Sequence, residues 1–176
     1  MFDPTAFDNM KVVIEGALYD LDLAGKIEII DRNDIVNMAK MSRSFDLYFR
    51  LPEALESAKI EINSDFINLA TELLPNSLSD KQSGCYMNLQ FFHEGITEAK
   101  PLKKIQRILF DIWGGTRKIG QSFTINPSES MIYNVISIEL DRLVGEDQME
   151  DMVELIDTMV TTLEHLQSYL IEIQTT

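Results

Sequence analysis

The C-terminal part of the chain carries an uninterrupted heptad pattern, and this pattern limits the possible folds more than any other feature of the sequence. From Asp147 to Ile173, apolar residues recur in alternating steps of three and four. A repeat kept for more than three heptads is typical of one long amphipathic helix. The residues of this C-terminal heptad are Met149, Met152, Ile156, Met159, Leu163, Leu166, Leu170 and Ile173.

Additional apolar residues widen the stripe beyond the two heptad positions. Val153 and Val160 fall at position e, and Leu155 and Tyr169 at position g. A wide stripe favours packing on a sheet, whereas a strict seam favours a two-stranded coiled coil. The helix would be about 40 Å long at about 1.5 Å per residue, which is longer than a small sheet needs. We therefore expect one part to cover a sheet and another to contact a second copy or a partner; the alternative is an ordinary core-covering helix.

Most of the sequence before this helix is typical of short strands. Alternation of apolar and polar residues indicates half-buried strands, and turn residues such as Gly25 and Pro52 end two of them. The expected strands are 11–23, 26–31, 44–51, 58–62, 85–93 and 121–125. In residues 127–144 a capping-box pattern favours a helix, but β-branched residues in alternation favour a strand, which we choose. Helical spacing predicts two further helices, at 66–74 and 102–113.

These elements predict an α+β fold in a single domain, residues 1–176. We expect a mainly antiparallel sheet of five to seven short strands, covered by the C-terminal helix and by the helix near 102–113. A chain of 176 residues is long enough to bury a core without disulfides or metals.

Composition argues against several classes of partner. The net charge of −14 disfavours nonspecific binding to nucleic acid or to anionic membranes. Cys85 is the single cysteine, so no internal disulfide can form and a reducing compartment is expected. The N-terminus lacks the pattern of a signal peptide, and no run of 18 apolar residues occurs. We expect a cytoplasmic protein that contacts neither nucleic acid nor membrane.

One segment reverses the overall charge. Residues 100–118 contain six cations and one acid, Asp111. The cations of this basic segment are Lys100, Lys103, Lys104, Arg107, Arg117 and Lys118. The first four follow i, i+3, i+4 and i+7, so they form one stripe of the expected helix. The stripe is a solvated face, or pairs with the acidic stripe Glu150, Glu154 and Asp157, or binds a phosphate ligand or a nucleic acid.

No catalytic or metal-binding motif is present. The sequence lacks HExxH, CxxC, GxSxG, GxGxxG and GxxxxGK[ST]. Cys85 and His93 stand eight residues apart in one expected strand, about 26 Å at about 3.3 Å per residue, so they cannot form a dyad. Asp20 and Asp22 are better explained as an acidic strand end than as a cation site. We expect no cofactor and no metal ion.

The sequence thus favours a non-enzymatic interaction or regulatory protein, adaptor- or chaperone-like, acting through its C-terminal helix. Its partner would be another protein or a second copy of itself. The alternative is a module that binds a phosphate ligand or nucleic acid through the basic segment. An enzyme is the third reading, because a site assembled from distant residues leaves no motif in one sequence.

Overall fold

The computed structural model describes residues 5–73, 84–128 and 131–175. The helices are α1 (Ala6–Leu23), α2 (Phe66–Leu73), α3 (Ala99–Trp113) and α4 (Met149–Gln174), and a short 3-10 turn, Glu146–Gln148, precedes α4. The strands are β1 (Glu28–Asn37), β2 (Ser42–Arg50), β3 (Ser57–Ser64), β4 (Tyr86–Glu94), β5 (Lys118–Asn126) and β6 (Met131–Glu139).

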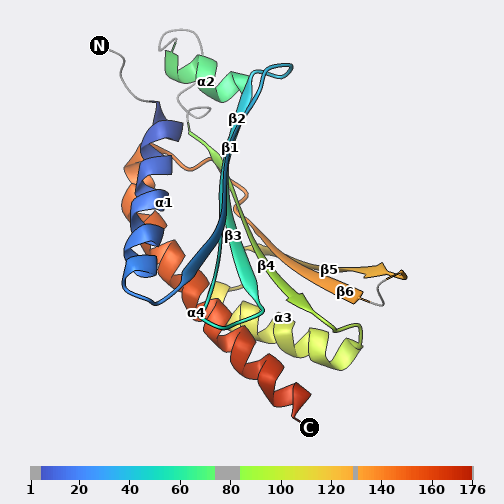
Figure 1. Cartoon of the computed structure of the whole chain (residues 1–176). Coiled ribbons are helices and arrows are strands. Elements are labelled where there is room, and N and C mark those ends of the chain that lie inside the picture. The colour runs from blue at the N-terminus through green and yellow to red at the C-terminus, as the bar shows by residue number, and fades with distance from the viewer. Residues whose placement is uncertain (1–4, 74–83, 129–130, 176) are drawn as a thin grey trace.

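The six strands form one curved antiparallel sheet with helices on one side. The strand order is β1-β2-β3-β4-β6-β5, and every neighbouring pair is antiparallel. Figure 1 shows α1 and α4 side by side on one face of the sheet, with α3 below β5 and β6 on the same side. This arrangement confirms the predicted α+β fold with a long C-terminal helix and a second helix near 102–113. The single domain stays a prediction.

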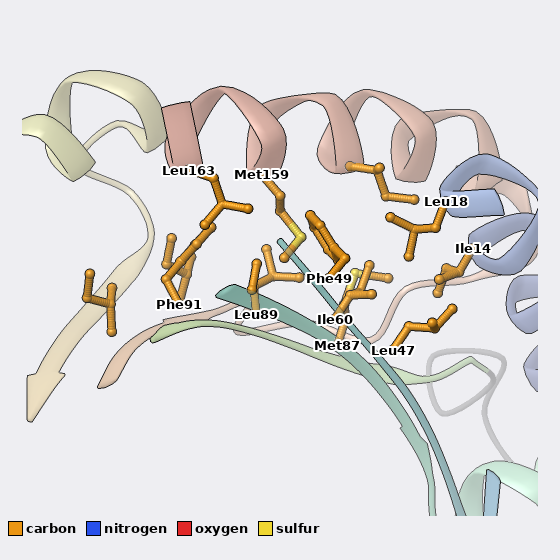
Figure 2. Close-up of a cluster of buried hydrophobic side chains, with 14 of the residues drawn as sticks. Ile14, Leu18, Leu47, Phe49, Ile60, Met87, Leu89, Phe91, Met159 and Leu163 are labelled. Carbon is orange, nitrogen blue, oxygen red and sulfur yellow. The ribbon is translucent and has the colours of Figure 1, made fainter. Parts of the chain in front are cut away.

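The C-terminal heptad forms the centre of the core. Met159 and Leu163 of α4 point toward Phe49, Leu89 and Phe91 of the sheet (Figure 2). The sheet supplies alternate residues of its central strands to this layer, as the period of two in a strand requires. These sheet residues are Phe45, Leu47, Phe49, Ala58, Ile60, Ile62, Met87, Leu89, Phe91, Ile136 and Ile138.

The strand predicted for 11–23 is wrong, because these residues belong to α1. Phe7, Met10, Ile14 and Leu18 are buried and follow helical spacing, so they place one apolar stripe of α1 against the core. The helix begins after Thr5, whose hydroxyl oxygen accepts a hydrogen bond from the Asp8 amide at 3.4 Å. Burial of this stripe outweighs the strand preference of the β-branched residues.

Replacing Gly16 by alanine is expected to stabilise the protein by about 1 kcal/mol, because glycine in a helix interior costs about that much relative to alanine. Gly16 is exposed inside α1, and a Cβ there would meet nothing within 4 Å. Urea denaturation of the two proteins measures the difference. A Gly16→Ala variant that is less stable than the wild type would contradict a helix here.

The remaining elements follow the sequence with small changes. The strand expected at 26–31 continues to Asn37, and the ambiguous segment 127–144 contains β6, a strand as predicted. The expected helix at 66–74 is present to Leu73; residue 74 lies outside the described ranges. Asp65 caps it, since its Oδ1 accepts from the Asn68 amide at 2.9 Å. No helix in the described ranges is long and apolar enough to cross a membrane.

Candidate functional site

The residues of the C-terminal heptad are buried in the core of their own chain. Six of its eight residues are at most 3% exposed, and Met149 and Ile173 are partly buried against the same core. The outer side of α4 shows different apolar residues, of which Val153 and Ile171 are about half exposed. A second copy could reach the heptad only if α4 left its own sheet. Candidate interaction surfaces must therefore be sought elsewhere on the molecule.

The six cations of the basic segment lie in three separate places. Lys118 of β5 pairs with Glu139 of β6, with 2.7 Å between Nζ and Oε2. The Arg117 guanidinium lies over the Trp113 ring, 5.7 Å from its centroid. The other four cations are exposed on α3 and form no ion pair with any described residue: Lys100, Lys103, Lys104 and Arg107. Of the three alternatives, the pairing with Glu150, Glu154 and Asp157 is not seen among the described residues.

Arg117 lines a cleft between the end of α3 and the first turns of α4. Its volume is about 260 Å³. Arg142, from the segment after β6, and Asp151, from α4, line it as well. We call it the Arg117 cleft. Charged residues of both signs and apolar residues line it together. Of the charged lining residues, only Arg117 belongs to the basic segment that the sequence singled out.

The side of the sheet opposite α1, α3 and α4 is a second candidate, which we call the open face (Figure 1). None of these three helices crosses it. By strand register, this face includes Glu28, Asp31, Asn33, Ile35, Ser44, Asp46, Tyr48, Arg50, Ser57, Lys59, Glu61, Asn63, Tyr86, Asn88, Gln90, Phe92, Glu94, Lys118, Ser122, Thr124, Tyr133, Val135, Ser137 and Glu139. Several of these side chains are half-buried by their neighbours.

An aromatic pair stands near the middle of the open face. The rings of Tyr48 and Phe92 stack with 5.9 Å between centroids and an interplanar angle of 27°. Lys59 lies over the Tyr48 ring, 5.5 Å from its centroid, and also pairs with Glu61. Burial alone would lower the pKa of Lys59, but the hydrogen bond and charge of Glu61 raise it above its usual value.

Carboxylates lie beside this pair. Asn33 donates through Nδ2 to Asp31 Oδ2 at 3.1 Å and to Asp46 Oδ1 at 2.9 Å, so one amide holds two carboxylates together. Asp46 is 7% exposed. Alternation in 44–51 already predicts that Asp46 and Tyr48 point away from the core. The sequence does not indicate that this side of the sheet has no helix of its own over it.

A small cavity of about 70 Å³ lies under the start of α3, beside His93 and Gln121. His93 is 4% exposed, and neither ring nitrogen has a hydrogen-bond partner in the described part of the chain. Gln121 donates through Nε2 to the Leu102 carbonyl at 3.1 Å, while its Oε1 is buried without a partner. Buried polar groups ordinarily have partners, and a cavity of this size has room for bridging water.

The burial of His93 gives the stability of the protein a predictable pH dependence. Desolvation lowers the pKa of His93 below its ordinary value of 6.5, and an interaction with the Glu94 backbone offsets this in part. Below pH 6.5 the unfolded chain takes up a proton that the folded chain does not, so the free energy of unfolding falls as pH falls. Above about pH 7 both states are neutral and the dependence on His93 disappears.

We therefore expect a His93→Phe variant to lose part of the decrease in stability between about pH 7 and pH 5, a range above the ordinary pKa values of carboxylates. Urea denaturation at several pH values measures this. His165 is exposed on α4, so His165→Gln serves as the control and should keep the wild-type dependence. Equal pH dependence in all three proteins would contradict a buried neutral His93.

The acidic residues do not assemble a metal site in the described ranges. Asp20 and Asp22 lie on α1, whereas Asp34 of β1 pairs with Lys11 and Arg43. No group of three or more His, Cys, Asp or Glu side chains able to hold a metal ion occurs there.

Comparison with models of protein families, with curated proteins and with solved structures finds no match to this chain. Function has to follow from the surfaces and clefts of the chain itself.

Proposed function

We propose that this chain is a non-enzymatic cytoplasmic interaction protein, adaptor- or chaperone-like, that binds a basic segment of a partner protein on the open face of its sheet. The observation that carries the proposal is the contrast between the two faces of the sheet. One face is covered by α1, α3 and α4, whereas the other presents an aromatic pair among carboxylates. The sequence favoured the C-terminal heptad as the binding surface. Because the heptad is buried in the core, we place the binding surface on the open face instead.

The aromatic pair supplies the apolar contact. Aromatic residues are enriched at the centres of protein interfaces, where they bury large areas at low entropic cost. Tyr48 and Phe92 come from strands that are not neighbours, β2 and β4, and their stacked rings bridge over β3. Apart from Val135, which lies opposite Phe92, the neighbouring residues of the pair are mostly polar, as in the rim of an interface.

The charges of the open face favour a basic partner. Its cations Arg50, Lys59 and Lys118 each pair with a carboxylate of the same face. Three other carboxylates, Asp31, Asp46 and Glu94, have no ion pair among the residues that the structure describes. A lysine or arginine of a partner would pair with Asp31 or Glu94, which are exposed, while Asp46 adds its negative charge from a buried position. The overall charge of −14 would attract such a partner.

The test uses a defined peptide, Lys-Ser-Phe-Lys-Ser-Phe-Lys, added to isotope-labelled protein and followed by amide chemical shifts. We expect saturable shifts in β2, β3 and β4, and weaker binding as salt rises. Two matched peptides, one with glutamate for lysine and one with serine for phenylalanine, should bind more weakly.

Matched variants test whether the peptide contacts the open face. Tyr48→Ser should weaken binding, whereas Tyr19→Ser, which removes an exposed tyrosine of α1, should not. Shifts confined to the helical side, or equal binding of the glutamate peptide, would refute the proposal.

A second candidate function rests on the exposed cations of α3, which stay free of ion pairs within the described ranges. These cations could bind the phosphates of a nucleic acid, although the overall negative charge of the protein would repel it. A labelled single-stranded oligonucleotide at low salt tests this. Arg107→Glu should then weaken binding and reduce its salt dependence. No binding at low salt would remove this candidate.

A further inference from the structure

We infer that the Arg117 cleft binds a small zwitterion with an apolar side chain, either a free apolar amino acid or a short peptide of such residues. The cleft lies on the helical side of the sheet, between α3 and α4, and the inference does not depend on the function proposed for the open face. Three features of the cleft carry it: a wall with two guanidinium groups, a wall with two carboxylates, and an apolar floor.

The positive wall is formed by Arg117 and Arg142, which come from two segments far apart in the sequence. Neither forms an ion pair within the described part of the chain, whereas Arg32, Arg43 and Arg50 each do. A guanidinium group binds a carboxylate through two parallel hydrogen bonds. Arg117 is thus available for the carboxylate of a ligand. Arg142 donates to the side-chain oxygen of Gln148 at 3.1 and 3.2 Å, and a ligand carboxylate would replace this neutral partner.

Arg117 is held in place by its contact with Trp113. The guanidinium lies 5.7 Å from the centroid of the indole ring, within the range of a cation–π interaction. The indole Nε1 donates to Thr162 Oγ1 at 3.0 Å, and Thr162 Oγ1 donates to the Thr158 carbonyl at 2.7 Å. This chain of contacts ties the ring to α4 and so fixes the position of the guanidinium before a ligand arrives.

The negative wall is formed by α4. Asp151 and Glu154 lie in its first turns, Thr158 lines the cleft further along the helix, and Gln148 lines it from the 3-10 turn before α4. Neither carboxylate pairs with a cation in the ranges that the structure covers. Two arginines and two carboxylates leave the cleft without net charge but with separated charges. A ligand that is neutral overall and carries both an ammonium and a carboxylate group complements this pattern.

The floor and the volume of the cleft limit the rest of the ligand. The floor is apolar and consists of Met87, Ile112, Leu140, Val144, Met152 and Leu155. The volume of about 260 Å³ is below the range of roughly 300–1,000 Å³ that is typical for drug-sized ligands. An amino acid or a very short peptide with an apolar side chain is therefore the appropriate size. A neighbouring hollow that shares Arg117, Leu140 and Arg142 has room for the additional residues of a peptide.

The single tryptophan of the chain, Trp113, lines this cleft and reports on its occupancy. L-leucine and Leu-Leu, added up to about 10 mM, which is beyond the millimolar end of specific affinity, should change its fluorescence in a saturable way. Binding should also raise the melting temperature. N-acetyl-leucine lacks the ammonium group and leucinamide lacks the carboxylate, so each should bind about tenfold more weakly. Preference for Leu-Leu over leucine would identify the peptide.

Two variants test the walls separately. Arg142→Gln should weaken the binding of leucine but not of leucinamide, and Asp151→Asn should weaken leucine but not N-acetyl-leucine. Arg107→Gln and Glu164→Gln change exposed charges outside the cleft and serve as controls for net charge. If N-acetyl-leucine binds as tightly as leucine, the cleft is an anion site and the inference is wrong. If no compound changes either the fluorescence or the melting temperature, it is wrong as well.

Discussion

Replacing Met159 by aspartate is expected to unfold the protein. Met159 is fully buried where α4 crosses the sheet, and it packs near Phe49 and Leu89 (Figure 2). Met159 belongs to a cluster of buried hydrophobic side chains, and burying an unpaired charge in such a cluster is among the most destabilising changes known. The expected loss exceeds about 4 kcal/mol, which is most of the roughly 5–15 kcal/mol that stabilises a typical domain.

Circular dichroism and light scattering measure the two possible outcomes of Met159→Asp. Val153→Asp is the matched control, since Val153 lies on the same helix but is 43% exposed, and this variant should stay folded. If Met159→Asp instead gave folded monomers from a wild-type dimer, the heptad would be an interface between copies, as the sequence alone allows. A wild-type monomer that this change unfolds would assign the heptad to the core of its own chain.

The heptad illustrates what a sequence pattern can and cannot predict. The spacing of Met152, Ile156 and Met159 indicates a helix with one apolar side, because that spacing depends on the helix alone. Which surface covers the apolar side depends on the rest of the fold. The central strands were predicted for the same reason as the helix, since alternation in 44–51 and 85–93 is a property of each strand by itself.

The failure at α1 has a different cause. Val12, Val13 and Ile14 favour a strand locally, but the apolar positions Met10, Ile14 and Leu18 follow the helical period of the segment. Burial of a complete stripe against the core and α4 outweighs the preference of three neighbouring residues. Counting the period over the whole of 6–23 would have predicted the helix.

The candidate sites were less predictable than the fold. The Arg117 cleft combines residues from the loop after α3, the segment after β6 and the start of α4, so no local pattern connects Arg117, Arg142 and Asp151. Residues 100–118 differ from the rest of the chain in their positive charge, yet the fold separates their cations into a helix surface, a cross-strand ion pair and the cleft. The alternation in each strand predicts the polar residues of the open face. It does not distinguish a binding surface from an ordinary solvent-facing side of a sheet.

A substitution at Gly84 is the second change for which we expect a large loss of stability. Gly84 has a φ of +121°, a backbone conformation that residues with a side chain rarely adopt, and an added Cβ would lie 2.5 Å from the Val144 carbonyl oxygen. At the next residue, the Cys85 amide donates to that same oxygen at 2.9 Å, and the Val144 amide donates to the Cys85 carbonyl at 2.8 Å. A side chain at position 84 would therefore force apart the bridge that joins the start of β4 to the segment after β6.

Gly84→Ala is expected to destabilise the protein by about 3 kcal/mol or more, because backbone strain of about 1–3 kcal/mol adds to the steric clash. Gly95→Ala separates the two contributions, since Gly95 also has a positive φ, +89°, but its Cβ would meet nothing within 4 Å. Urea denaturation should thus show a smaller loss for Gly95→Ala, and equal losses would mean that the chain does not pack tightly at Val144. Because Val144 also lines the Arg117 cleft, Gly84→Ala should alter the fluorescence of Trp113 across that cleft, whereas Gly95→Ala should leave it unchanged.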